Sequence, residues 1–353
     1  MRVLHAADFG GVAPGGFVPL IVALARRLTA RGDEVALAVP RTEGATWHQQ
    51  ARDAGIELHL VDGPREAARF ARAWRPDVAH VHFFGWELPL TLALWSTRAR
   101  IFWHVHSTSL RGGRVRPSSK TLAKYRLAGA RVERFVTVSR AVADELHALG
   151  APRGRVVAIR NEVDSARFRP PDAGERANAR AALGLADGER AILFFGRDPA
   201  LKGADVLAEA LARGRFANAV VVTVATPPEA QAELARCART IGVELADDVV
   251  PLMWACDALA VPSRGEGFAL VLLESALAGL PVAASDLPAL REAAAGRSAV
   301  YFAAAGDPDA FARALGEALA TPHERASAPS PASARNALDD WAERVDALYA
   351  RGS

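Results

Sequence analysis

The stretch SRGEGFALVLLESALAGLPVAASD, Ser263 to Asp286, contains a glycine-flanked loop, an apolar helical segment and a β-rich segment in succession. Glu274 falls in the middle of the apolar segment. In a helix its neighbours at positions i−4, i−1, i+3 and i+4 are Leu270, Leu273, Leu277 and Ala278. An unpaired carboxylate on such a face would cost on the order of several kcal/mol, so Glu274 requires hydrogen-bond donors. A ribose diol offers two donors at carboxylate spacing, and an ion pair with another helix is the structural alternative.

The loop before this helical segment has the features of a phosphate-binding turn. Gly265 and Gly267 flank Glu266 and allow the backbone to come close to a ligand. The helix that follows presents free backbone N–H groups to an anion. We therefore expect a bound phosphate to contact the helix start, which consists of Gly267, Phe268, Ala269 and Leu270. The alternative for Glu266 is an acid that only compensates the helix dipole.

A second candidate loop, FFGRDPALKGAD, spans residues 194–205 and connects an apolar strand to a helix, where open α/β sheets bind ligands. The chain has 43 Lys plus Arg, and only three of them are lysines: Lys120, Lys124 and Lys202. The presence of a lysine in this loop therefore requires an explanation. An ammonium group suits a diphosphate crowded by the backbone of Gly196, and Arg197 can bind two oxygens at once. A solvated surface lysine is the alternative.

Short β-rich segments alternate with helical ones along the whole chain, which predicts parallel sheets covered by helices on both faces. With 353 residues, half of them apolar, the chain is long enough for two α/β domains. A polar, proline-bearing run over residues 160–177 separates the two halves, and a helix is expected over residues 229–242 of the second half. We expect Rossmann-like domains over 1–163 and 164–328, followed by a docked C-terminal helix within 329–353.

Composition excludes several classes of protein. The net charge of +3 and the isoelectric point near 9.2 are too weakly basic to indicate nucleic-acid binding, and no basic run is interleaved with aromatic residues. Cys237 and Cys256 lack the spacing of a disulfide framework or a zinc site, so a reducing cytosol is the simplest compartment. The apolar strand before Asp8 is too short for a signal peptide. No apolar run reaches the roughly 18 residues that a membrane span requires.

The two loops carry a resemblance to a known family. SRGEGFALVLLESALAGLPVAASD resembles the E-x7-E region of the retaining GT-B glycosyltransferases of family 4 (GT4), and GRDPALKGADVLAEAL resembles that family's diphosphate loop. In the same order, DFGGVAPGGFVPLIVALARRLTARGDEV resembles the N-terminal glycine loop and first helix. PDVAHVH and HVHS resemble its strand ends, RNEVDSARFRP an inter-domain segment and WAERVDALY the closing helix. The likeness covers nearly the whole chain.

This resemblance implies two Rossmann-like domains facing a central cleft and transfer of a glycosyl group from a UDP- or GDP-sugar with retention of anomeric configuration. It implies acceptor contacts from residues 1–163, donor contacts from 164–328 and a closing helix that crosses back to the first domain. The implied residue roles are the ribose for Glu274, the transferred sugar for Glu266 and His106, and the diphosphate for Arg197 and Lys202. Gly15, Gly16 and Asn161 would lie beside the donor or acceptor. No metal or other cofactor is implied.

Histidines occur in two HVH sequences, His80 and His82, and His104 and His106. Alternation along a strand puts both members of each pair on one face, so neighbouring strands could assemble four imidazoles as a metal site. No carboxylate or cysteine joins them at ligand spacing, which favours histidines that only hydrogen-bond. We therefore predict no metal.

Basic residues gather after His106. They are Arg111, Arg114, Arg116, Lys120, Lys124, Arg126, Arg131 and Arg134, against the single acid Glu133. A solvated face is the first interpretation, and an anionic acceptor or an anionic membrane surface is the functional alternative. The sequence thus predicts a cytoplasmic protein, with a peripheral position at the inner membrane face as an option. The acceptor is expected to be a small molecule, a glycan or a lipid-linked group.

The sequence departs from the family pattern at particular positions. Glu162 stands where the family's N-G-V-D turn has glycine, and would cost about 1 kcal/mol if the turn required a positive φ. TPPEAQAEL replaces a glycine-rich turn, and SDLPALREA lacks a glycine pair after Asp286. These departures keep a non-catalytic nucleotide-sugar-binding protein as the alternative. An NAD-dependent oxidoreductase is disfavoured because neither half has G-x-G-x-x-G between strand and helix.

Overall fold

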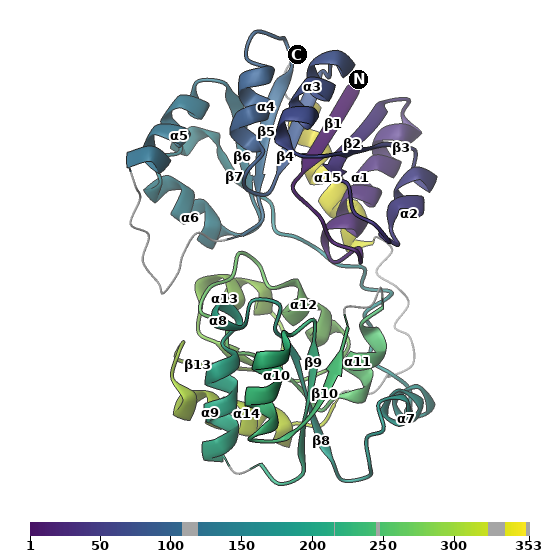
Figure 1. Cartoon of the computed structure of the whole chain (residues 1–353), viewed down its shortest axis with the longest axis vertical. Helices are drawn as coiled ribbons and strands as arrows, with labels where there is room; N and C mark the ends of the chain where they lie inside the picture. Colours follow the sequence, from purple (N-terminus) through teal and green to yellow (C-terminus); the bar gives the residue numbers. More distant parts are fainter. Residues whose placement is uncertain (108–118, 215, 245–247, 324–335, 351–353) are drawn as a thin grey trace. The chain divides into compact units, whose positions relative to one another are not determined.

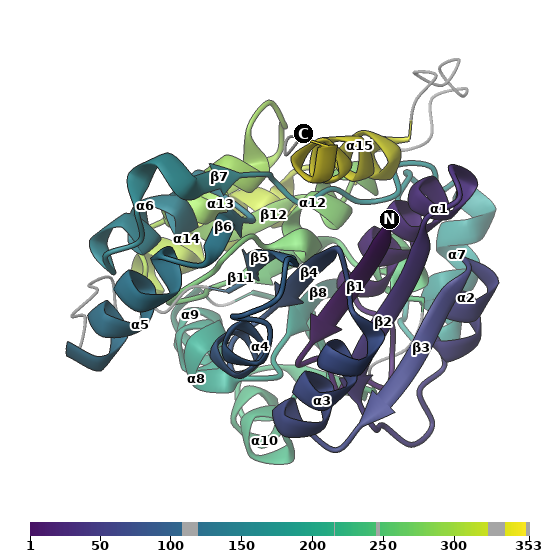
Figure 2. The ribbon, with the colours of Figure 1, turned by 90° about the horizontal axis from the view of Figure 1, so that it is seen from above.

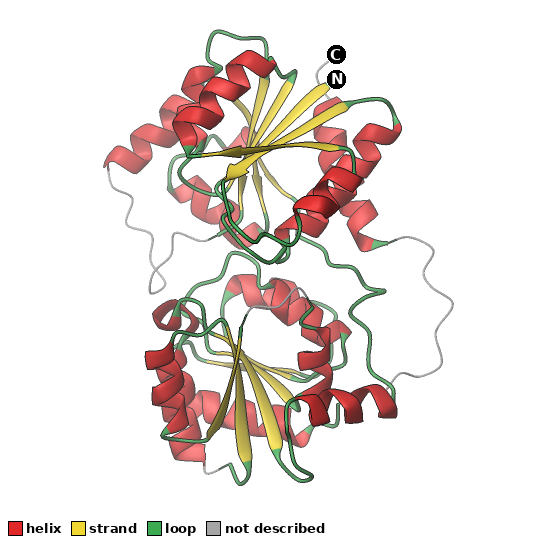
Figure 3. Ribbon diagram, turned by 45° about the vertical axis from the view of Figure 1, so that its right-hand side comes forward, coloured by secondary structure: helices red, strands yellow, loops and turns green. Residues whose placement is uncertain are grey.

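The computed structural model describes residues 1–107, 119–214, 216–244, 248–323 and 336–350 (Figure 1). These residues divide into two units. Unit 1 contains residues 1–107, 119–163 and 336–350, and unit 2 contains the described residues between 164 and 323. Each unit is an α/β structure in which helices flank a central sheet (Figure 3).

Unit 1 is built on a parallel sheet that has seven strands in the described residues, in the order β3-β2-β1-β4-β5-β6-β7. The strands are β1 (Arg2–Ala7), β2 (Glu34–Pro40), β3 (Ile56–Val61), β4 (Val78–His82), β5 (Arg100–Val105), β6 (Val132–Thr137) and β7 (Val156–Ala158). The helices are α1 (Phe17–Ala30), α2 (His48–Asp53), α3 (Pro64–Trp74), α4 (Glu87–Ala93), α5 (Ser119–Gly129), α6 (Arg140–Ala148), the 3₁₀ helix η1 (Arg153–Arg155) and α15 (Ala337–Ala350). The strand order reverses between β1 and β4.

Unit 2 repeats this topology with six described strands in the order β10-β9-β8-β11-β12-β13, all parallel. The strands are β8 (Arg190–Phe195), β9 (Ala219–Val224), β10 (Arg239–Val243), β11 (Ala258–Val261), β12 (Val282–Ser285) and β13 (Val300–Ala303). The helices are α7 (Ala173–Ala182), α8 (Pro199–Lys202), α9 (Ala204–Gly214), α10 (Pro228–Ala235), α11 (Val250–Ala255), α12 (Leu270–Leu277), α13 (Pro288–Ala294) and α14 (Pro308–Ala320). Here the order reverses between β8 and β11.

The C-terminal helix α15 belongs to unit 1, where it packs against α1 (Figure 2). Trp341, Val345 and Tyr349 are buried in the same apolar cluster as Leu24 and Leu28 of α1. The apolar stripe of α15 thus completes the core on one face of the unit 1 sheet.

Two expectations for unit 2 are wrong in detail. The helix expected over residues 229–242 ends at Ala235, and Arg239–Val243 forms strand β10 beside β9. The β-branched residues Thr240, Ile241 and Val243 suit a strand better than a helix. The polar run over residues 160–177 is also not entirely a connector, because Asp172 caps α7 through a capping box with Glu175.

Candidate functional site

The loops that follow β8 and β11 lie against each other at the carboxyl ends of neighbouring strands. This is the point where the strand order of unit 2 reverses, the usual ligand site of an open α/β sheet. Arg264 holds the loops together: its backbone N–H donates to Leu201 O (2.8 Å), and its guanidinium binds Ala200 O and both carboxylate oxygens of Asp205. The loop after β11, predicted to bind a phosphate, and the loop after β8, predicted to bind a diphosphate, therefore pack together.

Lys202 and Glu266 are brought together in this structure. Lys202 Nζ donates to Glu266 Oε1 at 2.7 Å, and the buried hydroxyl of Ser263 donates to the same oxygen at 2.7 Å. Glu266 Oε2 has no partner among the described residues. An ammonium group has three N–H donors, so Lys202 keeps donors for further oxygens. The arrangement presents a fixed carboxylate oxygen beside a cation.

Close packing explains the glycines of the β8 loop. A Cβ on Gly196 would lie 2.5 Å from Thr226 Oγ1, and one on Gly203, which has φ 73°, would lie 2.1 Å from Pro262 O. A larger residue at Gly203 would push the loops after β8 and β11 apart, and one at Gly196 would collide with Thr226 after β9. The neighbouring Arg197 is exposed and makes no hydrogen bond or ion pair with the described part of the chain. Its guanidinium is therefore open to a ligand.

Helix α12 begins at Leu270, four residues after Glu266, and Glu274 is its fifth residue. Ala269 is its N-cap, no side chain caps its first turn, and no acidic residue lies in that turn. Gly267 and Ala269 are buried, and Phe268 and Leu270 are partly buried. Burial raises the pKa of Glu274 to about 7, opposed by the charge of Arg167. No hydrogen bond to the Glu274 carboxylate is formed within the described residues, so hydrogen-bond donors on a ligand would favour its charged form.

Gly15, Gly16 and Asn161 are three of the four predicted site residues that belong to unit 1. Gly15 has φ 52°, is exposed and precedes Gly16, the N-cap of α1. Asn161 is buried, and its Oδ1 has no hydrogen-bond partner among the described residues. The turn at Asn161 is formed without the positive φ that a glycine would require, because Glu162 lies in ordinary backbone space and pairs with Arg344 at 3.2 Å. The departure at Glu162 is therefore unstrained.

The histidines of β4 and β5 lie on one face, together with His5 of β1, which the sequence prediction missed. Burial lowers the pKa of His5 and of His106 to about 3. Two groups of three histidines have ring nitrogens within 4.8 Å of one another: His5, His80 and His82, and His82, His104 and His106. No carboxylate or thiolate joins either group in the described residues. His5 could be identified only from the pairing of β1 with β4, because this pairing places His5 opposite His80.

The basic stretch after His106 does not form a continuous charged face in the described residues. Arg111, Arg114 and Arg116 lie outside them. Lys124 binds the buried Glu87 at 3.2 Å, and Arg131 donates to four backbone carbonyls. Arg134 donates to Glu133 O. These three cations stabilise the fold, while Lys120 and Arg126 are exposed. No described helix is long and apolar enough to cross a membrane.

Other residues of the site were missed from the sequence. Ser263 and Arg264 stand inside the quoted motif. Ser263 binds Glu266 within its own loop, whereas Asp205, the partner of Arg264, lies 59 residues away in sequence and is brought close by the packing of two loops. Only the polar Ser263, two residues after the apolar strand β11, could have indicated a role at the strand end.

Comparison with known sequences decides the family. The chain is 30% identical to a D-inositol 3-phosphate glycosyltransferase of Xylanimonas cellulosilytica, over 95% of this chain and 90% of that protein. The pattern described as "Glycosyltransferase Family 4" matches residues 14–167, and "Glycosyl transferases group 1" matches residues 189–321. The chain belongs to the group 1 glycosyltransferases of family 4. A similar relative from Streptomyces avermitilis, with the same name, is 28% identical over 88% of this chain and 76% of that protein.

Two solved structures share the fold of this family member. Anabaena HepE, determined with UDP and glucose, superposes with a TM-score of 0.77 at 17% identity, over 99% of this chain and all of that one. Sucrose-phosphate synthase from Thermosynechococcus elongatus superposes with a TM-score of 0.70 at 17% identity, over 99% and 95%. The expectation of a GT-B fold with two Rossmann-like sheets is confirmed, as are a glycosyltransferase activity and a nucleotide-sugar donor.

Proposed function

We propose that the chain transfers a glycosyl group from a UDP- or GDP-sugar to its acceptor with retention of configuration and without a metal ion. The observation that carries the residue assignment is the contact of Lys202 Nζ with Glu266 Oε1 at 2.7 Å. It brings a cation and a carboxylate together where the loops after β8 and β11 meet. The diphosphate would bind Lys202, Arg197 and the start of α12, while the transferred sugar would lie against Glu266.

Stabilisation of the leaving group is the main physical demand on such a site. Negative charge grows on the diphosphate as the glycosyl bond breaks, and fixed cations in a water-poor site favour that state. Lys202 is held in place by Glu266, and the loop that carries it is fixed by Arg264 and Gly203. Little reorganisation is therefore needed when the charge develops. One such contact contributes on the order of 3 kcal/mol to the transition state.

The free oxygens of two carboxylates would select the donor. Glu266 Oε1 already accepts from Lys202 and Ser263, which leaves Oε2 for a sugar hydroxyl. Glu274 lies further along α12 and would accept from the ribose diol. The leaving phosphate would take the proton of the acceptor, as the family resemblance implies, so no protein base is assigned. Gly15, Gly16, Asn161 and His106 would contribute from unit 1.

The acceptor is proposed from the names of the similar proteins. The relatives at about 30% identity are named D-inositol 3-phosphate glycosyltransferases, which makes D-inositol 3-phosphate the first acceptor to test. A lipid-linked or glycan acceptor would be tested next. The described basic residues give little support to a membrane-bound acceptor, since Lys124, Arg131 and Arg134 bind within the protein.

A panel of UDP- and GDP-sugars with D-inositol 3-phosphate tests the proposal. Product release and slow donor hydrolysis are measured with and without EDTA, and the anomeric proton of the product reports retention. Lys202→Ala and Glu266→Gln should each lower kcat at least about a hundredfold. The control is Arg213→Ala on the exposed face of α9, which should leave kcat unchanged. Unaltered turnover in both site variants would remove the residue assignment, and loss of activity with EDTA would remove metal independence.

A further inference from the structure

Five histidines form one layer on a face of the unit 1 sheet. His5 lies opposite His80 in the pairing of β1 with β4, and His82 lies opposite His104 in the pairing of β4 with β5. His106 follows β5 directly. The rings of His104 and His106 stack with centroids 4.3 Å apart, and those of His80 and His82 stack at 4.5 Å. His106 is partly exposed, whereas the other four are buried.

Two hydrogen bonds connect three of these rings in series. His5 Nδ1 lies 3.0 Å from His82 Nε2, and His82 Nδ1 lies 3.0 Å from His106 Nε2. His82 therefore uses both ring nitrogens within the series. His80 is outside it, because its Nδ1 contacts the Tyr349 hydroxyl. His104 is also outside it, since neither of its nitrogens has a hydrogen-bond partner in the described residues.

The protons of the three rings are coupled. A neutral imidazole has one N–H donor and one acceptor nitrogen, so both hydrogen bonds must run in the same direction. All three rings are neutral near pH 7, because burial lowers the pKa of each of them far below its ordinary value. If His5 donates to His82, then His82 donates to His106, and the proton of His106 is on Nδ1. If the direction is reversed, Nδ1 of His106 is an acceptor.

The buried end of the series decides the direction. His5 Nε2 is buried and has no hydrogen-bond partner among the described residues. A buried N–H without an acceptor is less tolerated in proteins than an acceptor with an unused lone pair. The proton of His5 is therefore expected on Nδ1, and the hydrogen bonds run outward from His5 to His106.

Neighbouring rings hold His106 in the orientation that this series requires. Its ring stacks between His104 and Phe83, with the Phe83 centroid 4.4 Å away, and Phe17 presents an edge at 5.6 Å. Phe83 has φ 64°, a conformation that a bulky residue adopts only where its surroundings impose it. The plane of His106 and the role of its Nε2 are thus both fixed. Its Nδ1 is the nitrogen left for a ligand.

We propose that His5 and His82 are positioning residues that hold His106 as the Nδ1–H tautomer, which donates a hydrogen bond to an oxygen of the transferred sugar. The proposal rests on the proposed function, in which His106 lies beside that sugar. It also predicts a preference among donor sugars. A sugar without an oxygen acceptor at that position leaves the His106 N–H without a hydrogen bond, and the free-energy cost of this unpaired donor disfavours such a sugar.

A matched pair of variants tests the proposal. His82→Phe and His104→Phe each replace one ring of the layer with another aromatic ring, but only His82→Phe removes hydrogen bonds of the series. Nitrogen NMR of the ¹⁵N-histidine-labelled full chain distinguishes protonated from unprotonated ring nitrogens without any substrate. The parent and His104→Phe should show His106 protonated at Nδ1. In His82→Phe the two nitrogens of His106 should give averaged signals of mixed tautomers.

Turnover gives the second measurement. His82→Phe should lower kcat roughly tenfold to a hundredfold, the range found elsewhere when the hydrogen-bond partner of a functional histidine is lost. The KM for the donor should stay within about threefold, because the diphosphate contacts of unit 2 are intact. His104→Phe keeps a ring on which His106 can stack and removes no hydrogen bond of the series, so it should keep the parent's kcat. If His82→Phe does not fold, His5→Phe is used in its place. Removing His5 removes the first donor, so the hydrogen bond between His82 and His106 is free to run in either direction.

Several results would overturn the proposal. One is a parent protein with His106 protonated at Nε2, and another is a His106 tautomer that does not change in His82→Phe or His5→Phe. One equivalent of tightly bound metal in the purified protein would do the same, because ligation would use the lone pairs of the series. A parent that turns over no nucleotide sugar would instead refute the proposed function, while the NMR spectra would still report the tautomer.

Discussion

Carboxylates on apolar surfaces create a conflict between desolvation and function, and Glu274 illustrates it. The side chain sits on α12 beside the buried Leu273 and Ala278, and burial raises its pKa to about 7. The charge of Arg167 lowers that pKa without cancelling the effect of burial. The free protein thus keeps a carboxylate whose charge is poorly compensated, which is the state expected of a group that awaits hydrogen-bond donors from a ligand.

Glu274→Gln should change the pH dependence of stability. Between about pH 4.5, the ordinary value, and pH 7 the folded protein holds a proton on Glu274 that the unfolded chain has released. The free energy of unfolding therefore decreases as pH rises through this window. Glutamine removes that decrease, so the variant should resemble the parent at pH 4 and exceed it in stability at about pH 8. Urea midpoints at both pH values measure this, and an equal difference at both would contradict it.

At the same scale, the sequence named candidate side chains for the site but not the contacts between them. Glu274 could be chosen because its apolar neighbours make a charge costly, Glu266 because glycines flank it, and Lys202 because the chain has only three lysines. The contact between Lys202 and Glu266 could not be predicted, because it depends on how two loops pack. His5 was missed for the same reason: its partners are on other strands.

At the level of elements, periodicity predicted long, buried segments well and short segments poorly. The first helix begins at Phe17 and ends before Gly32, which has φ 89°, as expected from the sequence. Strand β10 was missed because its five residues are only partly covered, at the edge of the sheet, and carry no alternation. Helices α5 and α13 were missed too. Helix α5 buries only Tyr125, Ala128 and Gly129 and therefore lacks an apolar stripe, whereas α13 has only seven residues, directly after Asp286 and Leu287.

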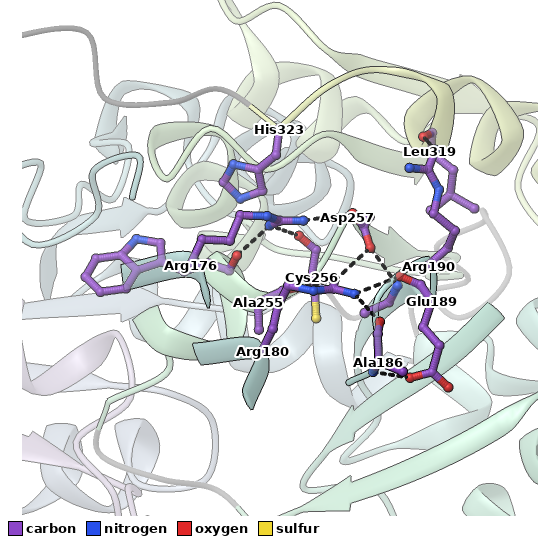
Figure 4. A network of polar contacts seen from close by, with 12 residues as sticks. Arg176, Arg180, Ala186, Glu189, Arg190, Ala255, Cys256, Asp257, Leu319 and His323 are labelled. Atoms are coloured by element: carbon purple, nitrogen blue, oxygen red, sulfur yellow. Dashed lines mark hydrogen bonds and ion pairs between the residues drawn. The ribbon is translucent and has the colours of Figure 1, made fainter. Parts of the chain in front are cut away.

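Helix α7 shows how a polar segment can be anchored without an apolar stripe. Arg176 and Arg180 extend from α7 toward the start of β11, where both bind Asp257 (Figure 4). Arg176 also donates to Cys256 O at 2.8 Å, and Arg180 donates to Glu189 O at 2.9 Å. Asp257 completes the network by accepting from Ala191 N at 2.8 Å. One carboxylate therefore links α7, β8 and β11.

Asp257→Asn should destabilise unit 2 by about 2 kcal/mol, because it leaves two partly buried guanidinium groups without their counter-charge. The relative exposure of the side chains is 15% for Asp257 and 22% for Arg176, so solvent screening keeps the loss below that of a fully buried pair. Chemical denaturation followed by a unit 2 probe measures the loss. Glu209→Gln is the control, since its pair with Arg213 is exposed and should contribute less than about 1 kcal/mol. Equal losses in both variants would contradict the argument.

At the level of the whole molecule, the first and last elements of the chain build the same unit. Helix α15 follows unit 2 in the sequence but contributes Trp341 and Tyr349 to the core of unit 1. Tyr349 reaches His80 of the histidine layer, and Trp341 stacks on His104 at 6.2 Å. The sequence predicted that this helix must dock, because its apolar stripe cannot remain exposed. Core clusters of the two units share no residue, so their stabilities can be perturbed separately.

Trp341→Ala should lower the free energy of unfolding of unit 1 by about 3–5 kcal/mol, since a fully buried indole is replaced by a cavity. The effect should appear in β1, β4 and β5, although residue 341 is far from them in sequence. Leu315→Ala in α14 is the crossed control: it removes a fully buried side chain from unit 2 and should act there. Hydrogen exchange, read peptide by peptide, separates the two. Faster exchange in β8 and β11 after Trp341→Ala, with β1 and β4 unchanged, would show that α15 does not stabilise unit 1.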